Sequence, residues 1–342
     1  MKRIVQHNYF LPIAIEAFPD ESAKSLLMRL AERNHLSHPK RLLELIRGSG
    51  PCDLLRQDLT PLSEICLCDP RDWERATFQV EVGEKGVRVY RLDGHEFSRD
   101  YFLVGRHARV CPECIAEFGY ARQIWEIAFC VACPLHQGLL VDRCPACEQP
   151  IQGLRQSIFC CQCGLPLRTV IAGEASEFEL HVAGLFWRLF GISTPISPPS
   201  VLPVDLSIRL ASLSSDGLCK LLWYLGVYVR SLGKVDAGKA RARLEVKAVR
   251  IILQAAFDLL WDWPDEYLRV LRSLQGDPRL IKAHTLMEQW FGSIRLFLAN
   301  EMTEPEFAFV RSAFEMEMRK VWRTIRQSKL PEIVGRQLEL EF

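Results

Sequence analysis

The sequence predicts a mainly α-helical protein in which small cysteine-based modules separate two helical regions. Apolar residues recur at helical spacing towards both ends of the chain. Nine of the thirteen cysteines fall within 106–170, and a Pro- and Ser-rich stretch follows at 193–203. We therefore predict an N-terminal helical domain at 1–105, a tandem metal-binding domain at 106–170 and a C-terminal helical domain at 171–342.

The N-terminal region should begin with two short helices. The segment 19–22 (Pro-Asp-Glu-Ser) has the acids and the serine of a helix start, and leucines follow it at helical spacing. Residues 35–39 interrupt the pattern, and a second apolar helix over 42–46 should end near Gly48. Two short helices joined by a tight turn indicate a helix-turn-helix-like domain or a plain helical hairpin. Alternating valines over 77–92 predict a small β-hairpin.

The central cysteines form four pairs with the spacing of zinc knuckles, in which one tight turn presents two ligands to a tetrahedral ion. Eighteen residues separate the first two pairs, a spacing typical of a zinc ribbon, and twelve separate the last two. The predicted ligands are Cys111, Cys114, Cys133 and His136 at one site, and Cys144, Cys147, Cys160 and Cys163 at the other. We predict two structural Zn²⁺ per chain, because four protein ligands leave no open position and small modules need the metal to fold.

The ligand assignment leaves alternatives open. Cys161 is able to replace Cys160, since C-x-C also occurs in zinc sites, and Cys130 competes with Cys133 but lacks a paired partner. Cys66-Leu67-Cys68 is a metal fragment or, like Cys52 and Cys219, a set of ordinary buried thiols. The pairs would otherwise be buried apolar thiols or redox dithiols, for which four correctly spaced pairs are not expected.

Five helices are expected beyond the linker. They cover about 205–231, 239–262, 265–274, 279–299 and 304–328. Basic residues recur on two of these helices, where they contact phosphates or form a solvated face: Lys239, Arg241, Arg243, Lys247 and Arg250, and Arg319, Lys320, Arg323, Arg326 and Lys329. Aromatic residues in the metal region form a small core or stack on nucleobases: Phe118, Tyr120, Trp125, Phe129 and Phe159.

Composition and charge narrow the class of protein. The apolar fraction of 49% and the charged fraction of 25% are ordinary for a soluble globular chain. The formal net charge of +1 is low for a protein that coats nucleic-acid backbones, so contact with DNA should be local or made through a partner. The first residues do not read as a secretory signal, and the apolar stretch 221–229 is too short to span a bilayer. We expect a cytoplasmic protein with no membrane partner.

The cysteine region resembles the TniQ/TnsD family of transposon target-selection proteins. The matching elements are Cys111-Pro-Glu-Cys114, Gly119-Tyr120, Ile124-Trp125, Cys133-Pro-Leu-His136 and Cys144-Pro-Ala-Cys147. The segment 19–22, with Ser25, Arg29 and Asn34, resembles the family's opening motif, and 291–295 resembles a patch in its CRISPR-associated members. Residues 123–127 lack the Arg-Leu-Ser-Trp-like run of many members, which leaves the subfamily open.

This resemblance implies a non-enzymatic adaptor for transposition. Such proteins link a target-recognition complex, here a crRNA-guided Cascade, to the AAA+ regulator TnsC, and they act as homodimers that meet target DNA mostly indirectly. The alternatives are a protein that binds a fixed DNA attachment site, a zinc-containing transcription regulator and a thiol redox enzyme. No P-loop, dinucleotide fingerprint or H-E-x-x-H motif occurs in the sequence, so we do not expect an enzyme.

Overall fold

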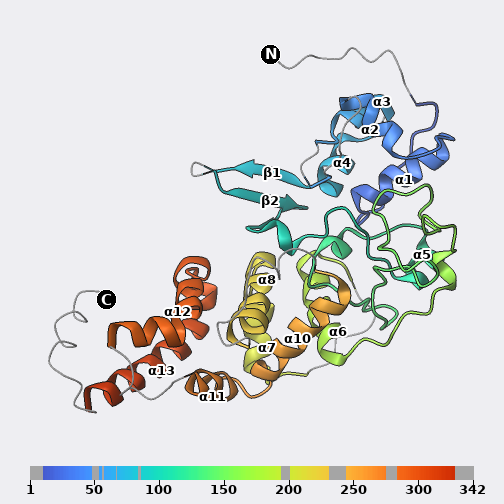
Figure 1. Ribbon diagram of the computed structural model, residues 1–342. Helices are drawn as coiled ribbons and strands as arrows, with labels where there is room; N and C mark the ends of the chain where they lie inside the picture. Colours follow the sequence, from blue (N-terminus) through green and yellow to red (C-terminus); the bar gives the residue numbers. More distant parts are fainter. Residues whose placement is uncertain are drawn as a thin grey trace. The chain divides into compact units, whose positions relative to one another are not determined.

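Figure 1 shows the computed structural model of the chain. The residues that it describes are 11–47, 54–55, 58–66, 68–83, 86–193, 201–230, 244–274 and 283–327. By its internal contacts the chain divides into two compact units, residues 1–199 with 243–250 and residues 200–242 with 251–342. The predicted N-terminal and metal-binding domains thus share one unit, and the boundary predicted between them at 105/106 stays a prediction.

Four short helices open the first unit. They are α1 (Ala23–Arg33), α2 (Lys40–Arg47), α3 (Pro61–Cys66) and α4 (Pro70–Ala76). They share a core in which Leu26, Leu30, Leu42, Leu62 and Trp73 are buried. The first two helices confirm the sequence prediction, whereas α3 and α4 were not anticipated. The DNA-binding role of a helix-turn-helix stays a prediction, and Gly48 and Cys52 lie outside the described residues.

The predicted hairpin is confirmed and is part of a three-stranded antiparallel sheet. Its strands are β1 (Gln79–Val82), β2 (Arg88–Leu92) and β3 (His95–Phe97), in the order β1-β2-β3. Asp93 and Gly94 join the last two strands with positive φ angles of 47° and 79°. Such angles belong to the tight hairpin turn that an Asp-Gly pair favours, and this turn adds the third strand.

The cysteine region contains little regular structure. Its one α-helix among the described residues is α5 (Pro112–Phe118), and isolated β-bridges hold much of the remaining backbone together. Helix α6 (Glu177–Leu189) follows and was not among the predicted helices. A capping box formed by Ser176 and Glu179 begins α6, and the helix buries Phe178, Phe186 and Trp187 around most of its circumference.

The second unit is helical, and α10 (Val246–Leu260) starts within the residues assigned to the first. Its other elements are α7 (Val204–Ala211), α8 (Ser215–Trp223), the π-helical turn η4 (Tyr224–Val229), α11 (Asp265–Ser273), α12 (Ala283–Glu301) and α13 (Ala308–Gln327). The predicted helix over 205–231 is divided because the Ser214 side chain accepts a hydrogen bond from Gly217 N–H and starts a new helix. The predicted end at Gly233 lies outside the described residues.

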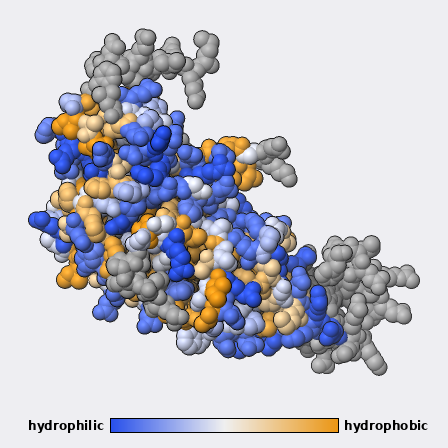
Figure 2. All heavy atoms as spheres, turned by 180° about the vertical axis from the view of Figure 1, so that it is seen from behind, coloured by the Kyte–Doolittle hydropathy of each residue, from blue (hydrophilic) through white to orange (hydrophobic). Residues whose placement is uncertain are grey.

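A close approach between η4 and α10 explains the glycine in the π-helical turn. A Cβ on Gly226 would lie 2.4 Å from the carbonyl oxygen of Ile252, so a larger residue would push the two elements apart. On the face drawn in Figure 2, hydrophobic residues are interspersed with hydrophilic ones. Within the part of the chain that is described, no helix is both long and apolar enough to cross a membrane.

Candidate metal centres

Cys111, Cys114, Cys133 and His136 come together in one cluster. Their possible ligand atoms all lie within 4.8 Å of one another, and the three cysteines are buried. His136 Nδ1 lies 3.4 Å from Cys111 Sγ, 3.3 Å from Cys114 Sγ and 3.6 Å from Cys133 Sγ. Cys114 Sγ and Cys133 Sγ are 3.6 Å apart.

These separations fit a tetrahedral zinc ion. Zinc–sulfur bonds of about 2.3 Å at tetrahedral angles place two sulfurs about 3.8 Å apart, and a zinc–nitrogen bond of about 2.1 Å gives a sulfur–nitrogen separation of about 3.6 Å. The Cys and His side chains are also the donors that zinc prefers. Hydrogen bonds from the Cys111 and Cys114 thiols lower the pKa of Cys133, which favours the thiolate form that zinc binds.

The start of helix α5 positions two of these ligands. Cys111 is the residue before the helix, Pro112 occupies its first turn, and Cys114 follows one turn later. Proline suits this place because the first helical N–H groups have no partner within the helix. The helix ends at Gly119, whose left-handed φ of 72° favours glycine. The proline after the first cysteine thus fixes the turn that brings both thiols to one side.

A tight turn positions the other two ligands. Cys133 N–H donates to Gly138 O, and Gln137 N–H donates back to Cys133 O, each at 2.8 Å. Gln137 adopts a φ of 55° to close the turn. The outer ring nitrogen of His136, Nε2, lies 3.1 Å from the carboxylate of Glu117 on α5. This carboxylate was not singled out in the sequence, although it follows Cys114 by three residues, which is one helical turn.

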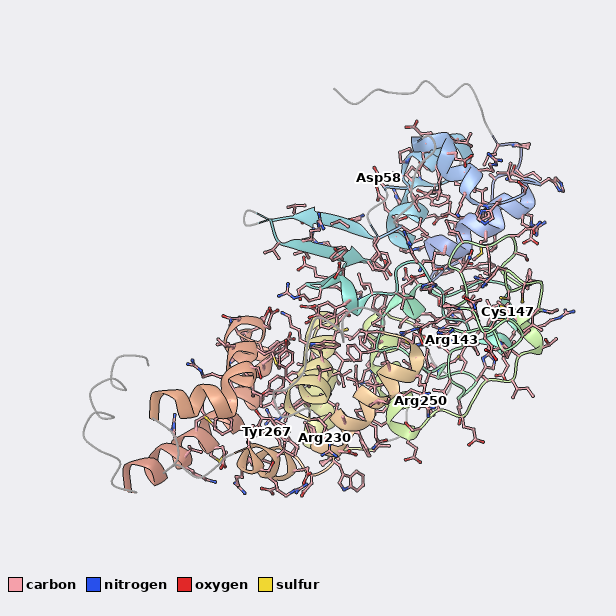
Figure 3. The ribbon with its side chains drawn as sticks, in the orientation of Figure 1. Asp58, Arg143, Cys147, Arg230, Arg250 and Tyr267 are labelled. Atoms are coloured by element: carbon pink, nitrogen blue, oxygen red, sulfur yellow. The ribbon has the colours of Figure 1, made fainter. Side chains whose placement is uncertain are left out.

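The second cluster contains Cys144, Cys147, Cys161 and Cys163, with their sulfurs within 4.8 Å of one another (Cys147 is labelled in Figure 3). Cys144 and Cys163 are 3.7 Å apart, and Cys147 and Cys161 are 3.9 Å apart, close to the sulfur spacing of a zinc tetrahedron. Burial raises the pKa of Cys144, but backbone N–H groups of Cys147 and Ala146 outweigh it and lower that pKa to about 7.

The sequence assigned Cys160 to this cluster, and the structure places Cys161 there instead. Cys161 N–H donates to Leu165 O and Gly164 N–H donates to Cys161 O, so the turn closes on Cys161. Cys160 pairs with Pro166 in a β-bridge beside the turn. Successive extended residues point their side chains to opposite sides, so only one of the two neighbouring cysteines faces the other sulfurs. The shorter C-x-C spacing that the sequence left open is therefore the one that the backbone adopts.

We expect Cys161→Ser and Cys160→Ser to differ in metal content. Cys161→Ser removes a thiol that faces the cluster and should release the metal of that cluster, whereas Cys160→Ser should retain it. The metal-to-protein ratio of each purified variant, measured by elemental analysis, checks this expectation. A Cys160→Ser protein that has lost one metal while Cys161→Ser keeps both would return the ligand role to Cys160.

The residues before α1 attach this helix to the segment after α5. Asp20 accepts a hydrogen bond from Tyr120 Oη at 2.7 Å and forms an ion pair with Arg122. Ala121 N–H donates to Ser25 Oγ at 3.0 Å, and Ala121 O accepts from Ser22 N–H at 2.9 Å. All of these side chains are buried. The opening motif found in the sequence therefore connects the N-terminal helices to the first metal cluster.

A second buried network lies beside this connection. Lys24 pairs with Glu126 and donates 2.9 Å hydrogen bonds to Val104 O and His107 O. Arg109 is buried and donates to the carbonyl groups of residues 127 and 128. Burial lowers the pKa of Arg109 to about 10, well above neutral pH, so it remains a cation. These charged residues hold irregular backbone together in place of regular secondary structure, and the sequence offered no periodic signal for them.

The remaining candidates fall outside the clusters. Cys130 is buried and lies apart from both ligand groups, and burial raises its pKa to about 12. Cys66 is buried and Cys68 is half-buried, and neither is in a ligand group of the described residues.

Tyr120, Trp125 and Phe129 are core residues as predicted, whereas Phe118 and Phe159 are partly exposed, at 38% and 40%. Of the basic residues, Lys239, Arg241, Arg243 and Lys329 lie outside the described residues.

Arg250 on α10 and Arg143, which directly precedes Cys144, form local contacts. Arg250 donates to Glu179 at 2.7 Å, and Arg143 pairs with Glu245 at 2.9 Å beside the second cluster (both arginines are labelled in Figure 3). On α13, Arg319 lies 3.7 Å from Glu315. Arg250 and Arg319, which belong to the two basic stretches, therefore have acidic partners within the protein, which favours the solvated-face interpretation of these stretches.

One comparison with known proteins found a match, and the matched residues include the first of these clusters. The family model described as TniQ matches residues 12–140. This range contains the connection around α1 and all four residues of the first cluster, and it ends before Cys144 of the second. A comparison with curated proteins found no match.

Proposed function

We propose that this chain is a non-enzymatic adaptor for target selection, because the TniQ family model, which matches residues 12–140, supports a protein associated with transposition. The adaptor links a target-recognition complex, a crRNA-guided Cascade, to the AAA+ regulator TnsC and so directs DNA insertion. The observation that carries this proposal is that the family match encloses the whole first cluster together with the helices attached to it.

Both clusters are proposed to hold zinc with a structural role. Each offers four Cys or His ligands to one ion, so a tetrahedral zinc would have no open position for water or substrate. When bound, the ion supplies folding free energy to a region that has little regular structure of its own. The metal centres then support a rigid surface for partners.

The near-neutral charge favours an adaptor over a protein that binds duplex DNA by itself. Strong binding to phosphate backbones requires many unpaired cations, whereas the chain has a formal net charge of +1. Several of the described arginines already have acidic partners. We therefore propose that target DNA is met mostly through the guided complex. The resemblance to the family is the ground for proposing two copies of this chain in the assembly.

The test is reconstitution of the assembly from the full chain, the host's crRNA-loaded Cascade and TnsC. Native mass spectrometry should find two copies of the chain on Cascade, with two zinc ions in each copy. TnsC should be recruited to a DNA target that matches the guide only when the chain is present, and a target without the matching sequence is the control.

Two results would contradict the proposal. TnsC recruitment that is unchanged without the chain would remove the adaptor role. Sequence-specific binding of duplex DNA by the chain alone, with an affinity that falls steeply as salt rises, would instead support recognition of a fixed attachment site.

A further inference from the structure

One ring nitrogen of His136 lies beside the cysteine sulfurs of the first cluster, and the other lies beside a carboxylate. Nδ1 faces the sulfurs of Cys111, Cys114 and Cys133 at 3.3 to 3.6 Å. Nε2 lies 3.1 Å from Glu117 Oε2, which is within hydrogen-bond distance. The imidazole is therefore held between the cluster on one side and a carboxylate on the other.

This arrangement determines which nitrogen carries the proton. A neutral imidazole that binds a metal through Nδ1 has its proton on Nε2, and an ionised carboxylate is able only to accept a hydrogen bond. We propose that Glu117 is a positioning residue for the first metal centre. It accepts the Nε2–H bond, selects the tautomer with a free Nδ1 and orients the ring towards the three thiolates. This proposal rests on metal binding by the cluster.

Helix α5 carries both a metal ligand, Cys114, and the carboxylate of Glu117. Cys114 and Glu117 are three residues apart and lie on neighbouring turns of the same helix, so the ligand and the carboxylate move together. The His136 side chain is 19% exposed and Glu117 is 58% exposed. Partial exposure weakens the hydrogen bond through competition with water, so the expected effect is at the low end of the range for carboxylates that support a metal-binding histidine.

Glu113 provides a matched control on the same helix. Its side chain is 60% exposed, almost as much as that of Glu117, and it carries the same charge. Its carboxylate oxygen lies 3.9 Å from Nδ1, beyond hydrogen-bond distance and on the side of the ring that faces the sulfurs. Replacing Glu113 therefore removes a nearby negative charge without removing the hydrogen bond to Nε2.

The experiment compares Glu117→Ala, Glu117→Gln and Glu113→Ala in the full chain with two bound metal ions. Metal affinity is measured by competition with a chelator, and cadmium-113 NMR of the Cd²⁺-substituted protein distinguishes the centre with three sulfurs from the centre with four. Glu117→Ala should weaken metal binding at the first centre by about tenfold, within the range of about 10–100-fold for such outer partners. Glu117→Gln should restore most of the affinity, because its amide oxygen also accepts the bond.

A spectroscopic readout separates this role from a general effect on folding. Nitrogen-15 NMR of the histidine should show Nε2–H in the natural protein, with slow proton exchange that becomes fast in Glu117→Ala. Equal weakening in Glu113→Ala, or affinity within about twofold of the natural protein in Glu117→Ala, would overturn the proposal. A natural protein that binds no metal at the first cluster would instead overturn the metal site itself.

Discussion

Cys133→Ser is expected to release the metal from the first cluster and to destabilise helix α1 together with the cysteine turn. Cys133 Sγ lies 3.6 Å from both Cys114 Sγ and His136 Nδ1, so the substitution removes one of the four ligands of the first cluster. The binding free energy of a structural zinc ion is on the order of 10 kcal/mol and contributes directly to folding. Because the segment after α5 is bonded to α1, the loss should spread to the N-terminal helices.

Hydrogen exchange and metal content together measure this effect. The metal-to-protein ratio should fall from two to one, and amides of α1 should exchange faster than in the natural protein. Cys130→Ser is the matched control, since Cys130 is buried three residues earlier but belongs to neither cluster. It should keep both metals. A Cys133→Ser protein with full metal content and unchanged protection in α1 would contradict the structural role of this centre.

Asp20→Ala is expected to lower the free energy of unfolding of the first unit by about 3–5 kcal/mol, because it leaves a buried cation without its partner. Asp20 is 8% exposed and Arg122 is 7% exposed. Burial lowers the pKa of Arg122, but the charge of Asp20 outweighs it, so the guanidinium stays charged when the pair is intact. The substitution also removes the acceptor for the Tyr120 hydroxyl. Hydrogen exchange of α1 amides across a urea series measures the loss.

A double-mutant cycle gives the control for this prediction. Arg122→Leu added to Asp20→Ala removes the unpaired charge, so the double variant should lose less stability than the sum of the two single losses. Asp205→Ala on α7 removes an exposed carboxylate from the second unit and should leave the protection of the α1 amides unchanged. Strictly additive losses for Asp20 and Arg122 would show that the two residues do not stabilise each other.

The helices and strands that the sequence predicted correctly are those whose pattern of apolar residues repeats within a few positions. The hairpin over 77–92 and the helices of the second unit follow from alternation and helical spacing, which act within a few residues. Helix α6 was missed although its capping box is visible as Ser176 and Glu179, since apolar residues surround much of this helix and blur its period. The split between α7 and α8 depended on a serine cap that competes with helix continuation.

The sequence by itself determined which residues are able to form two four-ligand clusters, because C-x2-C and C-x2-H spacings bring their ligands together within one turn. Only the tertiary structure decided between Cys160 and Cys161, since both spacings are possible. The backbone turn directs the Cys161 side chain towards the other three sulfurs of the second cluster. It also decided the pairing of Asp20 with Arg122, which are 102 residues apart, and of Glu117 with His136. Such partners are set by how distant segments pack, and no local periodicity encodes them.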